Sequence, residues 1–187
     1  LDDEITKFMS DMMFSTLTNV NFDPQRFVQY IVRSNDLKNK VIALAGNSSG
    51  KVPRGADDMA PTELEDMLKA AKHIGVMADE QLDMDIRSLR ELLIYGLKGM
   101  GAYAHHAHIL GKNDQTVNHF FFKGLAATLD DELTVNDLID LNMELGKVNY
   151  RCMELLNLAN TGAYGDPEPT EVLTTMKKGP FIVVSGH

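Results

Sequence analysis

The segment from 92 to 111 reads LLIYGLKGMGAYAHHAHILG and gathers several side chains that could do chemistry. It carries His105, His106 and His108, three histidines within four positions, shortly after three glycines within six positions. Clustered imidazoles can bind a metal, whereas closely spaced glycines are typical of a phosphate-binding loop or of a helix that packs against a neighbour. Which of these interpretations holds decides the class of protein.

The histidine spacing argues against a buried metal centre. Successive residues on a helix turn by about 100°, so His105 and His106 do not face the same ion. His105 and His108 could share a surface metal, but this helix offers no third ligand. A di-iron bundle needs Glu-x-x-His motifs, and no glutamate in the sequence has a histidine three residues further on. We therefore favour a polar helix face and keep the His105–His108 metal site as an alternative.

The glycines and one apolar stripe predict close helix packing. Gly96, Gly99 and Gly101 do not follow a predicted strand, which a dinucleotide or phosphate loop requires. On a helix, small residues let another backbone approach closely, at a cost of roughly 1 kcal/mol of helix propensity per glycine relative to alanine. The helical period places Gly96 on one stripe with six larger or apolar residues, which we expect to face the core. The stripe consists of Leu93, Gly96, Leu97, Met100, Tyr103, Ala104 and Ala107.

Two further candidate groups have structural interpretations. Cys152, the single cysteine, lies among apolar residues on a predicted helix and is interpreted as a buried small hydrophobe. One thiolate cannot hold an iron–sulfur cluster. Asp130 and Asp131 lie at a helix boundary and are interpreted as caps.

His187 is the candidate functional residue that position alone suggests. It follows Ser185-Gly186 after FIVV (181–184), a short run rich in β-branched residues that predicts a buried strand. Ligands of open α/β sheets bind at the carboxyl ends of strands, and a neutral imidazole can bind a metal or transfer a proton. The alternative is a terminal histidine that remains from a tag.

The elements that must position these residues are mostly helices. Apolar periodicity and capping residues predict helices over 2–16, from Asp23-Pro24 to about 44, from Thr62 to about 74, over roughly 85–110, from Asp114, and over 135–160 after Thr134. Residues 8–28 and 120–139 resemble each other, which suggests a duplicated helical hairpin. The predicted fold is mostly α, an antiparallel helical bundle followed by one strand of a missing α/β domain.

This reading divides the chain into a helical bundle domain over 1–160, truncated at its N-terminus, a linker over 161–179, and the first strand of an absent domain over 180–187. An isolated strand is not stable, so we expect it to pair with chain outside this sequence. The start at Leu1 fits this expectation of a fragment.

Composition excludes several classes of protein. A net charge of −9 without a Lys/Arg cluster argues against nucleic-acid binding. No apolar run approaches the ~18–20 residues of a membrane span, and the sequence shows no signal-peptide pattern. A single cysteine indicates a reducing, cytoplasmic location.

Four stretches together resemble the hybrid cluster proteins, also called prismane proteins or hydroxylamine reductases. They are LRELLIYGLKGMGAYAHHAHILG (89–111), FSTLTNVNFDP (14–24), ANTGAYGDPEPTEV (159–172) and KKGPFIVVSGH (177–187). The resemblance implies a helical domain followed by two α/β domains. It also implies a [4Fe–4S] or [2Fe–2S] cluster held by N-terminal cysteines and a hybrid iron–sulfur–oxygen cluster. The histidine of the family's Ser-Gly-His turn is a ligand of the hybrid cluster and corresponds to His187.

The leading hypothesis is therefore a fragment of an oxidoreductase that reduces hydroxylamine to ammonia, with nitric oxide as another proposed substrate and a redox partner protein as electron donor. The sequence lacks the family's cluster cysteines, so this fragment alone should bind no cluster and be inactive. The alternative is a non-enzymatic, all-helical scaffold or interaction module.

Overall fold

The computed structural model describes residues 2–17, 21–46, 58–75, 78 and 81–184. Within these ranges the chain forms six helices: α1 (Asp3–Ser15), α2 (Pro24–Ala45), α3 (Leu64–Ala71), α4 (Met84–Ile109), α5 (Gln115–Ala127) and α6 (Val135–Tyr164). The prediction of a mostly helical bundle is confirmed. No helix in the described ranges combines the length and apolarity needed to cross a membrane.

Polar caps fix where most of these helices begin. Asp23, the residue before Pro24, caps α2 because its carboxylate accepts a hydrogen bond from the Gln25 backbone amide. Asp114 caps α5 in the same way, through the amides of Thr116 and Val117. Thr134 begins α6 with a reciprocal capping box, in which the Asp137 carboxylate accepts from the Thr134 backbone. These three predicted starts are confirmed, because the cap residues satisfy amide groups that the first helical turn leaves unpaired.

The predicted bounds of two helices are wrong. The helix predicted from Thr62 to about 74 is shorter, since α3 begins at Leu64 with Glu63 as its N-cap and no side-chain cap bond, and it ends at Ala71. α6 continues to Tyr164, four residues into the range predicted as linker. Gly162 is accommodated within the helix, and the chain leaves the helix at Gly165, whose φ of +81° favours glycine.

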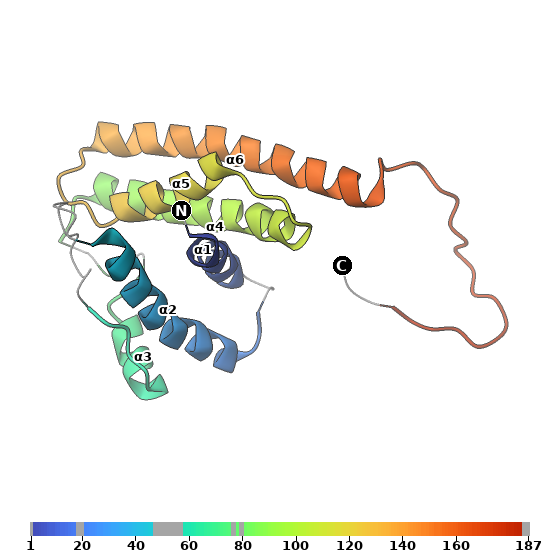
Figure 1. Cartoon of the computed structure of the whole chain (residues 1–187), viewed down its shortest axis with the longest axis horizontal. Coiled ribbons are helices and arrows are strands. Elements are labelled where there is room, and N and C mark those ends of the chain that lie inside the picture. Colours follow the sequence, from blue (N-terminus) through green and yellow to red (C-terminus); the bar gives the residue numbers. More distant parts are fainter. Residues whose placement is uncertain (1, 18–20, 47–57, 76–77, 79–80, 185–187) are drawn as a thin grey trace.

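The central element is α4, against which three other helices pack (Figure 1). α5 runs antiparallel to α6, as the ion pairs Lys123–Glu144 and Arg151–Asp114 show. α4 and α6 instead run parallel, because Gly96 meets Leu145 while the Cys152 thiol donates to the Met100 carbonyl further along both helices. α5 is thus antiparallel to both α4 and α6, as predicted for neighbouring helices of the bundle, whereas α4 and α6 share one direction.

The core of the bundle lies where α1, α4, α5 and α6 meet. The predicted stripe on α4 is confirmed, since Leu93, Leu97, Met100, Ala104 and Ala107 are fully or almost fully buried. The buried residues that complete this core are Met13, Val117, Phe120, Phe121, Ala127, Leu145, Val148 and Cys152.

A smaller cluster attaches α2 to α1. Ile5 and Phe8 bury themselves against Leu37, and the Tyr30 ring packs edge-on against Phe8. Lys40 bridges the carboxylates of Asp2 and Glu4. α2 and α3 lie on the side of the bundle away from α6 (Figure 1). Residues 8–28 and 120–139 both form a helix, a loop and a capped helix, while their duplication stays a prediction.

Close packing at the α4 glycines is confirmed at two of three positions. A Cβ on Gly96 would lie 2.2 Å from Leu145 Cδ2, and one on Gly101 would lie 3.0 Å from Met13 Cβ. A Cβ on Gly99 would meet nothing within 4 Å. Gly96 therefore allows α6 to approach, and Gly101 allows α1 to approach.

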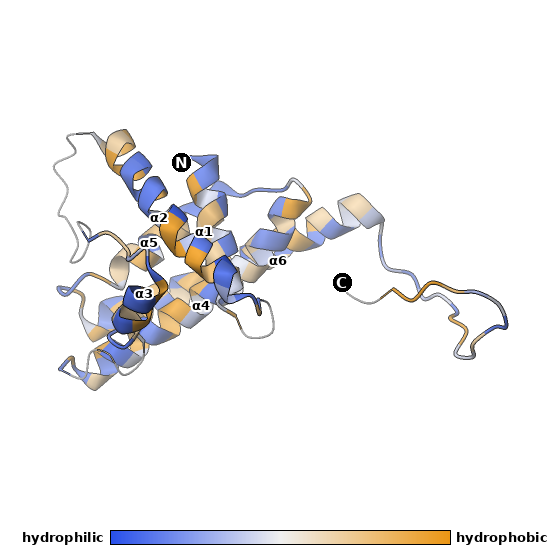
Figure 2. Ribbon diagram, turned by 90° about the horizontal axis from the view of Figure 1, so that it is seen from below, coloured by the Kyte–Doolittle hydropathy of each residue, from blue (hydrophilic) through white to orange (hydrophobic). Residues whose placement is uncertain are grey.

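Residues 165–184 leave the bundle as an exposed segment without regular secondary structure, and Figure 2 shows hydrophobic colour at the C-terminal end of this segment. The described residues form no strand here. Ile182 and Val184 are about nine-tenths exposed, so this structure does not bury the segment that was predicted as a buried strand. Its pairing with chain outside this sequence, together with the boundary at 180, stays a prediction.

We expect Gly96→Ala and Gly99→Ala to change stability in opposite directions. The first change forces Leu145 to move and should lower the free energy of unfolding by about 1–3 kcal/mol. The second adds a methyl group in open space and should raise it by up to about 1 kcal/mol through helix propensity. Urea unfolding followed by circular dichroism measures both, and equal effects of the two variants would contradict the close approach at Gly96.

Candidate functional site

The three histidines of α4 lie at the contact between α4 and α1. His105 Nδ1 is 2.6 Å from Oδ1 of Asp11, and both side chains are mostly buried. The Phe14 ring packs against the His105 ring at a centroid distance of 4.7 Å and against the His106 ring at 5.1 Å. This arrangement holds α1 in place and fixes the orientation of the His105 ring.

His108 belongs to a polar network between α1, α4 and α5. Its Nδ1 lies 3.2 Å from Ser10 Oγ and its Nε2 lies 3.1 Å from Asn113 Oδ1, which also accepts from Asn118. A neutral ring donates from Nε2–H to Asn113 Oδ1, while the Ser10 hydroxyl beside Nδ1 donates its one hydrogen to the Lys7 carbonyl 2.9 Å away. Burial lowers the pKa of His108, against the opposing effects of Asn113 and Asp11.

These contacts count against the alternative of a metal shared by His105 and His108. The Nδ1 atoms of the two rings bind different residues of α1, Asp11 and Ser10. Among the described residues, no three His, Cys, Asp or Glu side chains come close enough together to hold a metal ion. The cluster therefore acts as an interhelical contact.

Cys152 occupies the α4–α6 contact and is fully buried, which confirms its interpretation as a small core residue. Its Sγ donates to the Met100 carbonyl at 3.6 Å. Burial, with a smaller contribution from Asp114, raises the pKa of the thiol to about 12. Because the thiolate is the form that binds metals, Cys152 does not fit an iron–sulfur ligand.

A buried arginine that sequence patterns did not single out ties α4 to the α5–α6 loop. Arg90 is 6% exposed, and its guanidinium donates to the Asp130 carbonyl and to the Asp131 carboxylate. The Asp130 carboxylate accepts from the Glu132 amide, as a turn-capping residue does. The cap interpretation therefore describes Asp130, whereas Asp131 pairs with Arg90.

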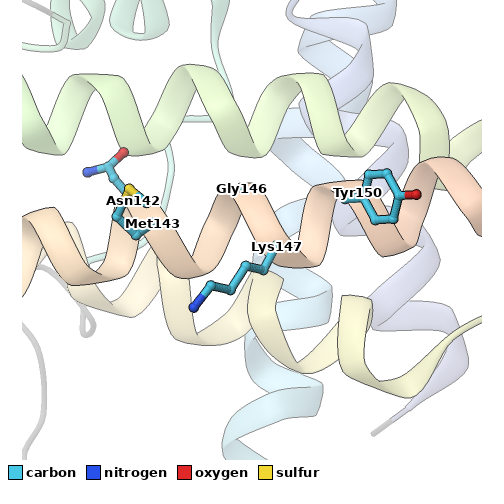
Figure 3. A pocket seen from close by; sticks show the side chains of 5 residues that line it. All are labelled: Asn142, Met143, Gly146, Lys147 and Tyr150. Atoms are coloured by element: carbon cyan, nitrogen blue, oxygen red, sulfur yellow. The ribbon is translucent and has the colours of Figure 1, made fainter.

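The outward face of α6 carries a shallow, mostly apolar groove, which Figure 3 shows from close by. Its lining residues are Asn142, Met143, Gly146, Lys147 and Tyr150. The groove is open to solvent and contains no acid–base pair. It therefore has the character of a contact surface, not of a reaction centre.

The predicted ligand His187 lies outside the described residues, as do Ser185 and Gly186. Besides Arg90, the residues that sequence reasoning missed are Ser10, Asp11 and Asn118. Ser10 and Asp11 meet their α4 histidines across 98 and 94 positions of sequence. Polar residues on α1 gave no local signal for these contacts.

The described residues thus define a helical scaffold domain whose polar clusters join helices. Comparison with known proteins places this domain. The whole chain, residues 1–187, matches the model of the Prismane/CO dehydrogenase family. It is 43% identical over 195 residues to a hydroxylamine reductase of Natranaerobius thermophilus and 42% identical over 195 residues to one of Kosmotoga olearia. Each alignment covers 100% of this chain and 35% of the relative.

A hydroxylamine reductase of Methanosarcina mazei is 42% identical over 185 residues, or 97% of this chain and 33% of the relative. The chain belongs to the Prismane/CO dehydrogenase family. It spans about a third of the length of these curated relatives. Membership implies iron–sulfur clusters in a full-length protein of this family, and Cys152 does not provide a ligand for one.

The lowered pKa of His108 predicts a loss of stability in mild acid. The unfolded chain takes up a proton near the ordinary pKa of 6.5, whereas the folded chain does so only at lower pH. The free energy of unfolding is therefore not reduced by His108 above pH 6.5, and it declines as the pH falls below this value. We expect His108→Gln to unfold with a weaker pH dependence between about pH 7 and pH 5.

Thermal unfolding of both proteins across this range measures the effect. His119→Gln is the matched control, since the His119 ring is exposed and, among the described residues, bonds the Gln115 carbonyl of its own helix. Parallel pH profiles for the unmodified chain and His108→Gln would contradict the assignment.

The buried thiol predicts slow labelling of Cys152 in the folded chain. A rise of the pKa from 9.0 to about 12 lowers the thiolate fraction at pH 8 roughly a thousandfold, before steric protection is counted. We expect Ellman's reagent to react slowly until urea unfolds the protein and then at the rate of a free thiol. Rapid labelling without denaturant would contradict this burial.

Proposed function

We propose that this chain is the helical part of a hydroxylamine reductase. The observation that carries the proposal is identity of 42–43% along essentially the whole chain to relatives with that name. The reaction is NH2OH + 2 e⁻ + 2 H⁺ → NH3 + H2O, in which the N–O bond breaks and a redox partner protein supplies the electrons. Nitric oxide is the second candidate substrate, since a reducing iron cluster can also bind its nitrogen.

The full-length protein in this proposal carries a hybrid iron–sulfur–oxygen cluster and a [4Fe–4S] or [2Fe–2S] cluster. The described residues do not fit as their ligands, because the single thiol is buried and bonded to a carbonyl, and no group of metal-binding side chains forms. The part of the chain with a proposed role at the hybrid cluster is His187, through a ring nitrogen. We also propose a cytoplasmic location, because a free, unpaired cysteine suits a reducing compartment.

The helical domain contributes rigidity to this function. α6 spans 30 residues, or about 45 Å at 1.5 Å per residue, and leads directly into the segment that ends in Ser185-Gly186-His187. Its parallel contact with α4 and the capping box at Thr134 hold this helix in place. Such support sets where the segment starts and leaves the chemistry to residues outside the described ranges.

The experiment is to measure iron and acid-labile sulfide per chain in the full-length protein purified without oxygen, together with hydroxylamine-dependent oxidation of a reduced dye. We expect His187→Ala to lose hybrid-cluster iron and at least about tenfold in turnover, since even the loss of a group that only supports a metal ligand typically costs this much. His119→Ala, a change at an exposed histidine of α5, is the control and should keep both.

A full-length protein with two clusters and an unaffected His187→Ala variant would overturn the ligand role alone. A full-length protein without iron would overturn the reductase proposal. The chain would then be read as a helical scaffold or interaction module.

A further inference from the structure

The contact between α4 and α6 has two sides, and only one is covered by a described helix. On the covered side, α5 packs into the seam, where Leu97 contacts Gly124 and Lys123 pairs with Glu144. The contact itself is made by Gly96 with Leu145 and by Asn142, whose amide donates to the Leu89 carbonyl. α5 thus fills the covered side from Leu97 on α4 to Glu144 on α6.

The opposite side of this seam carries exposed apolar residues at helical spacing, which we call the outer seam surface. It consists of Leu92, Tyr95 and Gly99 on α4 and of Ile139, Met143, Gly146, Tyr150 and Met153 on α6. The α6 residues are separated by four, three, four and three positions, which is the period of a helix that receives a partner helix. Met143 and Tyr150 remain 63% and 65% exposed.

Helical geometry places both rows along one seam. On α4, Leu92 and Gly99 lie four residues before and three residues after Gly96, so they share the flank of the contact that turns away from Leu97. On α6, Gly146 lies four residues after Asn142, on the flank that turns away from Glu144. Because α4 and α6 run parallel, these two flanks lie on the same side of the seam, and the groove shown in Figure 3 is lined there by residues of α6.

Two glycines on this surface have no packing reason within the described structure. A Cβ at Gly99 or Gly146 would meet no atom within 4 Å, in contrast to Gly96 and Gly124. Each costs its helix roughly 1 kcal/mol relative to alanine. Together with the apolar rows beside them, they leave room for another backbone to approach the seam.

We propose that the outer seam surface is the docking site of an amphipathic helix supplied by the rest of the full-length polypeptide. The length of chain outside this one favours that occupant, because these residues align with only 33–35% of the relatives. A contiguous apolar surface of this kind marks a contact site. The occupant presents apolar residues at i, i+3 or i+4 and i+7, and a carboxylate beside Lys147, which lines the groove.

Methionine oxidation tests the proposal with probes that the chain already contains. Hydrogen peroxide is applied to the 187-residue chain and to the full-length protein, and peptide mass spectrometry gives the oxidation rate of each methionine. We expect Met143 and Met153 to be oxidised at least about tenfold more slowly in the full-length protein. Met84, exposed at the start of α4, serves as the reference, and buried Met100 reports that the chain is folded.

A matched pair of glycine variants separates docking from folding. Gly146 and Gly162 are both on α6 with open space at the Cβ position, and only Gly146 lies on the outer seam surface. We expect Gly146→Glu to restore oxidation of Met143 in the full-length protein. Gly162→Glu should leave Met143 protected there. In the 187-residue chain, both variants should keep Met100 protected, which shows that they fold.

Equal oxidation of Met143 in the two proteins would overturn the proposal. Protection that appears in the 187-residue chain and grows with its concentration would also overturn it, in favour of a second copy as the occupant. The measurement reads neither iron nor turnover, so its result is independent of the proposed reductase activity.

Discussion

The approach of α6 to α4 at Gly96 is the constraint on which the rest of the structure depends. Leu145 occupies the space where a Cβ would lie, so the two longest helices pack closely. This approach also brings Cys152 to the Met100 carbonyl and Asn142 to the Leu89 carbonyl. The core is formed by apolar residues that close around this contact from α1 and α5.

Polar contacts then determine which helices join this pair and in which orientation. Arg90 fixes the loop before α6 through Asp130 and Asp131, and the α4 histidines hold α1 through Asp11 and Ser10. Buried groups of this kind contribute less to net stability than to a unique arrangement, because each would be left unsatisfied in a shifted register. Residues that suggest chemistry by type are used here to specify a scaffold.

Much of the fold was predictable because its signals are local. The caps at Asp23, Asp114 and Thr134 and the apolar stripe of α4 are read within one or two helical turns. The end of α6 was not, because Gly162 and Gly165 are both plausible stops and only the backbone shows which one takes a positive φ. The partners of His105 and His108 lie nearly a hundred residues away, and the predicted site residue His187 lies outside the described ranges.

The distance in sequence between α1 and α4 has a consequence for synthesis of the chain. α1 leaves the ribosome before the other described helices, yet the helix that buries its Met13 and Ser10 follows only after α2 and α3 have been made. Contacts at such separation form late, because a long loop must close before they are gained. Until then Ile5 and Phe8 can pack only against Leu37 and Tyr30 of α2. The small cluster on α2 therefore gives the nascent α1 an early partner, which shields part of its apolar face from other chains.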